Sequence, residues 1–171
     1  MRLALILLPL LALAGPAMAD ERFYAYDPVS NSARLLTRGI TLQVERGLFG
    51  ASLVERLFST AGSGSDGLER GGLSDAQMRA ALPDAEESNP YRIERDVTGS
   101  ALGRVLCPGA SEVWLVFGRV RPLRDITVQA VGVGQDGQAR HCQTLEYRYR
   151  GEWERPNDRD TPVGGGPAPL G

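Results

Sequence analysis

Histidine and cysteine, two residue types that commonly carry out catalysis, are scarce in this chain. His141 is the single histidine among 171 residues, and it lies next to Cys142. Neighbouring side chains on a strand point to opposite faces, so these two would form a Cys-His dyad only if a bulge intervened. One histidine also excludes metal sites that need two or more of them. We therefore assign no catalytic residue and no metal ligand from sequence.

The two cysteines, Cys107 and Cys142, are 35 residues apart and lack the C-x-x-C spacing of redox and zinc sites. In an oxidising compartment such a pair favours a structural disulfide. Closing a loop of about 36 residues would stabilise the fold by roughly 4 kcal/mol. The alternative is a pair of free thiols.

The sequence contains no motif for carboxylate, serine, lysine or nucleotide-dependent catalysis. Carboxylate pairs occur at Glu86-Glu87 and at Glu152 with Glu154, the first in an acidic loop and the second beside the C-terminal tail. The serines of Ser63–Gly67 do not fit G-x-S-x-G in any register, and no glycine-rich phosphate loop joins a strand to a helix. All 19 basic residues are arginine, which excludes lysine-based Schiff-base chemistry. We expect no cofactor.

The most organised polar feature is a set of arginines in the C-terminal half. Alternation along a strand over 139–153 places Arg140, Arg148 and Arg150 on one face and Leu145, Tyr147 and Tyr149 on the other. The preceding connection adds three more arginines, Arg119, Arg121 and Arg124. Grouped guanidinium groups can bind carboxylates or phosphates in a bidentate manner. The six arginines are our candidate binding face, and the alternative is a solvated face with cross-strand Arg-Glu pairs.

The first 19 residues have the pattern of a secretory signal. Arg2 precedes an apolar run over residues 3–14, and Ala17-Met18-Ala19 provides the small residues that a signal peptidase requires. We expect a periplasmic or secreted protein, with no transmembrane span after cleavage; the alternative is an uncleaved anchor. The net charge of −2 argues against a nucleic-acid partner.

The N-terminal half contains both strand and helix patterns. Residues 22–26 and the alternating segment 40–45 predict a hairpin joined by turn formers over 27–32. The apolar spacing over 51–60 predicts a helix, and residues 62–67 a flexible loop. Ser74 with Gln77 fits a capping box and predicts a helix ending before Pro83. We expect residues 62–90 to be the loosest part of the domain.

The C-terminal half predicts a strand over 91–96, a helix over 101–106, and a meander of strands at 113–117, 126–133 and 139–153 with an Asp-Gly turn at Asp136-Gly137. The expected fold is α+β: an antiparallel sheet made of the hairpin and the meander, which could be one sheet, with two or three short helices and one disulfide. The expected domain spans residues 20–155, followed by a disordered Pro/Gly-rich tail over 156–171.

Together these features predict an exported, non-catalytic binding or envelope-interaction module. Its expected partner is an envelope protein or an anionic envelope component. The alternative is a small periplasmic hydrolase that uses carboxylates or His141.

Overall fold

The computed structural model describes residues 20–46, 52–62, 65–85, 89–94 and 101–154. The predicted leader and tail lie outside these residues. The described chain forms eight antiparallel strands that close into a barrel. The strands are β1 (Asp20–Pro28), β2 (Ile40–Arg46), β3 (Ser52–Ser59), β4 (Ser65–Arg70), β5 (Asn89–Ile93), β6 (Glu112–Phe117), β7 (Ile126–Val133) and β8 (Ala139–Glu154).

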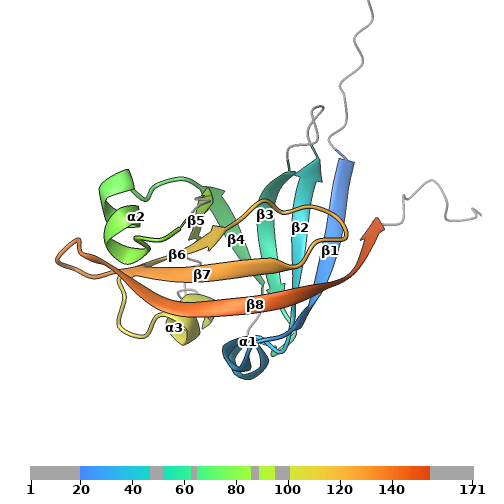
Figure 1. The fold of residues 1–171 in the computed structure, drawn as a ribbon, viewed down its shortest axis with the longest axis horizontal. Helices are drawn as coiled ribbons and strands as arrows, with labels where there is room; N and C mark the ends of the chain where they lie inside the picture. Colours follow the sequence, from blue (N-terminus) through green and yellow to red (C-terminus); the bar gives the residue numbers. More distant parts are fainter. Residues whose placement is uncertain (1–19, 47–51, 63–64, 86–88, 95–100, 155–171) are drawn as a thin grey trace, which may run out of the picture.

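Each strand pairs with its neighbour in sequence, and β8 pairs with β1 to close the sheet. Strands β7 and β8 cross β1–β3 at a steep angle, as expected for a small, strongly tilted barrel (Figure 1). The predicted antiparallel sheet is therefore confirmed, but the fold is mainly β, a closed barrel with short helices, where an α+β domain was expected. The hairpin and the meander belong to one sheet, but β4 and the closure into a barrel were not predicted.

The barrel interior is filled by side chains that alternate along the strands. On β2, Ile40, Leu42 and Val44 are buried, and the intervening residues are only partly so. Large side chains from other strands complete this core, among them Tyr24, Tyr26, Tyr91, Phe117, Leu145 and Tyr147. Eight strands enclose just enough space for such a packed interior.

A second apolar cluster lies on the outer face of β6 and β7. Helix α2 (Asp75–Ala81) covers this face, and Met78 packs with Trp114 and Val131. The predicted capping box at Ser74 and Gln77 is present at the start of α2. Strand β6 is therefore buried on both faces, the barrel interior on one side and α2 on the other, which explains its continuous apolar sequence.

The helix predicted over residues 51–60 is wrong, because this segment is strand β3. A register shift against β2 leaves Glu55 as an extra residue between Val54 and Arg56. This bulge lets Val54 and Leu57 both point into the core, although three positions separate them. The bulge therefore produces a helix-like spacing of apolar residues within a strand. The predicted loop over 62–67 is also partly wrong, since β4 begins at Ser65.

Two helices close one end of the barrel, which we call the helix end. Helix α1 (Asn31–Leu36) begins after its N-cap Ser30, where a turn was predicted. Helix α3 (Ala101–Leu106), which was predicted, places Leu102 and Leu106 in the core. The disulfide Cys107–Cys142 joins the end of α3 to β8 with a Cα–Cα distance of 5.4 Å, so the predicted bridge is confirmed.

Within the described part of the chain, no helix has the length and apolar character needed to cross a membrane.

Candidate binding surface

Five of the six predicted arginines lie on the β6–β7 connection, at the barrel end opposite α1 and α3, or on the part of β8 between this connection and the end of β1. Residues 118–125 connect β6 to β7 there and carry Arg119, Arg121 and Arg124, all exposed. Arg148 and Arg150 are exposed on the outer side of β8, beside this connection. Arg150 pairs with Asp27 of β1 at 3.7 Å. We call these five arginines the basic surface. The β6–β7 connection carries three of them and a single acidic residue, Asp125, so its net charge is positive.

Arg140 does not belong to the basic surface. It lies eight residues before Arg148 on β8, a separation of roughly 26 Å along an extended strand. Its guanidinium donates a hydrogen bond of 2.7 Å to the carbonyl oxygen of Pro108, directly after the disulfide cysteine of α3. Arg140 thus adds a hydrogen bond to the disulfide that joins the end of α3 to β8.

Tyr149 of β8 holds the β6–β7 connection in place. Its backbone N–H donates to Asp125 Oδ1 at 2.9 Å. Burial raises the pKa of Tyr149, and a hydrogen bond from the Leu123 backbone N–H to its hydroxyl lowers it in part. The connection is therefore attached to β8 on both sides of its turn.

Leu123 adopts an unusual conformation at this turn. Its φ of +59° lies in the left-handed region, which costs a bulky residue about 1–2 kcal/mol. Its side chain is 82% exposed, so burial does not offset that cost. Trp153, 46% exposed near the end of β8, is a second exposed apolar residue at the same end of the barrel. Strained residues that are held in place by their surroundings, as Leu123 is through Tyr149, cluster at functional sites.

The barrel interior beneath the connection is rich in tyrosine. The rings of Tyr24 and Tyr26 pack edge-on against Tyr149, with centroids 6.3 and 5.7 Å away. Arg46 donates to the Tyr24 hydroxyl at 3.3 Å and lies 3.8 Å from Glu152. The Tyr26 hydroxyl is buried and has no hydrogen-bond partner among the described residues, and burial raises its pKa. This rigid aromatic packing supports Tyr149 from inside the barrel.

His141 lies outside the basic surface and contacts neutral partners. Its Nε2 is 2.9 Å from Gln129 Oε1 and 3.1 Å from Thr144 Oγ1. The register shift between β7 and β8 does place a bulge at Cys142. However, the thiol of Cys142 is consumed by the disulfide, so no Cys-His dyad forms.

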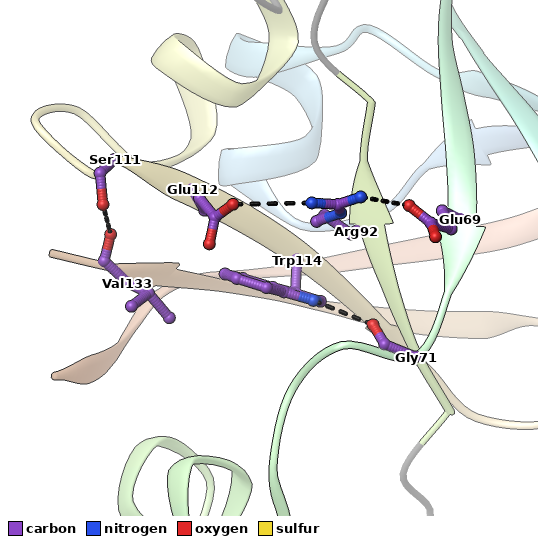
Figure 2. Close-up of polar contacts among 7 residues, drawn as sticks. All are labelled: Glu69, Gly71, Arg92, Ser111, Glu112, Trp114 and Val133. Carbon is purple, nitrogen blue, oxygen red and sulfur yellow. Dashed lines mark hydrogen bonds and ion pairs between the residues drawn. The ribbon is translucent and has the colours of Figure 1, made fainter. Parts of the chain in front are cut away.

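Carboxylates do converge elsewhere, in a hollow of about 450 Å³ where β4, β5 and the start of β6 meet. Figure 2 shows Arg92 between the carboxylates of Glu69 and Glu112. Arg92 is hydrogen-bonded to Glu69 and lies 3.7 Å from Glu112, and these contacts raise the pKa of its guanidinium. Glu94 also lines the hollow. None of these glutamates belongs to the carboxylate pairs noted in the sequence.

The cross-strand partner of Arg92 is a buried tryptophan, Trp114. Trp114 Nε1 donates to the carbonyl oxygen of Gly71 at 3.1 Å (Figure 2). Gly71 and Gly72 both have positive φ, and a Cβ on Gly72 would lie 3.4 Å from Trp114 Nε1. These glycines let the chain turn closely around the indole ring.

Among the described residues, no group of three or more His, Cys, Asp or Glu side chains is arranged to hold a metal ion. The fold is that of a closed, eight-stranded antiparallel barrel with a filled core. No family model, curated protein or solved structure matches the chain.

Sequence reasoning missed the residues that shape both sites. Leu123 offered a signal, because it is the one large aliphatic side chain in the arginine-rich run 121–124. Asp125 and Tyr149 gave none, since their contact joins positions 24 residues apart. Arg92 and its two glutamates come from three strands, and one of these, β4, was predicted only as a loop.

Proposed function

We propose that this protein is an exported, non-catalytic binding module that recognises an anionic component of the cell envelope through its basic surface. The observation that carries the proposal is the gathering of five exposed arginines from β8 and the β6–β7 connection. Arginine suits this role because its planar guanidinium binds phosphate and carboxylate groups in a bidentate manner.

The rigidity of the basic surface supports the same proposal. The connection is hydrogen-bonded to β8 through Asp125 and Leu123, and Tyr149 is packed from below by Tyr26. Arginines presented on a fixed frame lose less conformational freedom on binding than arginines on a flexible loop.

The test compares binding of the wild type and of charge-matched double variants to lipid A, peptidoglycan fragments and anionic phospholipid. We expect Arg148→Ala with Arg150→Ala to weaken binding to one of them by at least about ten-fold, because each phosphate-facing arginine contributes about 1 kcal/mol. The control is Arg34→Ala with Arg79→Ala, which removes the same charge from exposed positions on α1 and α2. If the two double variants bind all three probes equally well, the proposal is wrong.

The carboxylates around Arg92 support a second candidate, a small hydrolase. Glu69, Glu94 and Glu112 line one hollow, as a general acid and base would require. Against it, the side chains of Glu69 and Glu112 are 58% and 42% exposed and both contact Arg92. Such an ion-pair network lacks the apolar setting that tunes a catalytic acid. Hydrolysis of an envelope polysaccharide or ester that is abolished by Glu112→Gln, with folding unchanged, would favour this candidate.

A further inference from the structure

The β6–β7 connection combines cationic and apolar groups in an arrangement suited to a membrane surface. Leu123 stands at the turn with its side chain 82% exposed, and Arg121 and Arg124 lie on either side of it. Trp153 is exposed at the same end of the barrel. We propose that this end docks on an anionic phospholipid bilayer, with the arginines contacting lipid phosphates and the Leu123 side chain inserted among the acyl chains. This inference rests on the proposed function and names its partner.

Charge and apolarity would act at different depths of the bilayer. Arginines near an anionic leaflet gain about five-fold in affinity each, and this attraction is screened by salt. A leucine that leaves water for acyl chains gains about ten-fold or more. Tryptophan concentrates at the boundary between headgroups and acyl chains, which suits the partial exposure of Trp153.

The backbone of the β6–β7 connection also favours a bilayer as the partner of this surface. Leu123 has φ +59°, its backbone is hydrogen-bonded to Tyr149, and its side chain is left exposed. Insertion into a bilayer needs a fixed apolar protrusion and no complementary pocket. An acidic protein partner would use the arginines but would require such a pocket for Leu123.

The test uses co-sedimentation with vesicles of phosphatidylcholine alone or mixed equally with phosphatidylglycerol. The informative variant is Leu123→Asn, because asparagine tolerates positive φ and removes only the apolar tip. Its matched control is Leu35→Asn, at an 80% exposed leucine on α1, at the helix end of the barrel. All variants are prepared identically, so residues outside the described part of the chain contribute equally to each.

We expect the wild type to bind the mixed vesicles and not phosphatidylcholine alone. Leu123→Asn should weaken this binding about ten-fold, and Leu35→Asn should leave it unchanged. Equal binding by wild type and Leu123→Asn overturns the inference and leaves an electrostatic role for the arginines. Absence of vesicle binding, together with arginine-dependent binding to lipid A, peptidoglycan or an acidic protein, overturns it too. The proposed function would fail as well only if Arg148→Ala with Arg150→Ala bound every probe as well as the control Arg34→Ala with Arg79→Ala.

Discussion

Removal of the Cys107–Cys142 bridge should cost the protein a large part of its stability. The bond closes a loop of about 36 residues, so the chain-entropy relation gives about 4 kcal/mol of stabilisation. The described domain runs from residue 20 to residue 154, for which the unfolding entropy per residue converts this loss into a melting temperature lower by about 14 °C.

The assay is urea and thermal unfolding of the variant Cys107→Ala with Cys142→Ala, followed by circular dichroism. The reduced wild type is the matched control, because it keeps both sulfur atoms and separates the cross-link from side-chain packing. The urea m-value should rise in both reduced and double-alanine proteins, since an unfolded chain without the bridge exposes more surface.

A loss below about 1 kcal/mol, with an unchanged m-value, would refute the reasoning. It would show that the unfolded chain is not restricted by the bridge. A third result is that the m-value rises as expected while hydrogen-exchange protection is lost only in α3. That result would assign the destabilisation to the native state, at the helix end of the barrel.

Three further outcomes are expected. Gly132→Ala should destabilise by about 1–3 kcal/mol in urea unfolding, because a Cβ there would lie 2.8 Å from the Ala110 Cβ and 3.1 Å from Cys142 Sγ; an unchanged midpoint would show that this corner is loosely packed. Burial raises the pKa of Tyr147 to about 12 from its ordinary value of 10, so the stability it contributes is complete below pH 10 and falls by about 3 kcal/mol towards pH 12. Tyr147→Phe should make this alkaline decline shallower, while the raised pKa values of Tyr26 and Tyr149 keep part of it, and an equally steep decline would assign all of it to other groups. Leu123→Asn should unfold at a temperature equal to or above that of the wild type, since it relieves about 1 kcal/mol of backbone strain, and a lower temperature would contradict that strain.

Short-range patterns were sufficient for much of the secondary structure. The alternation over 40–45, the capping box at Ser74 and Gln77, and the Asp-Gly turn at Asp136-Gly137 each predicted an element that the structure contains. These signals depend on contacts within one strand, one helical turn or one hairpin. They therefore carry over to the folded protein without knowledge of its other parts.

Prediction failed where one strand depends on another. The apolar spacing of β3 is explained only by its bulge against β2, and residues 65–70 become β4 through pairing with β3 and β5. The basic surface was likewise predicted only in part. Alternation along β8 correctly places Arg148 and Arg150 outward, but it does not show that the length of the strand separates Arg140 from them.

The sequence by itself determined the residue types, the outward phase of the β8 arginines and the pairing of the two cysteines, because these follow from local periodicity and from the presence of only two thiols. The tertiary structure decided the rest. Closure of β8 on β1 brings Tyr149 onto Tyr26, and Tyr149 in turn fixes Asp125 and Leu123 beside the arginines. That arrangement depends on the tilt and register of a closed barrel, which are properties of eight paired strands and of no single segment.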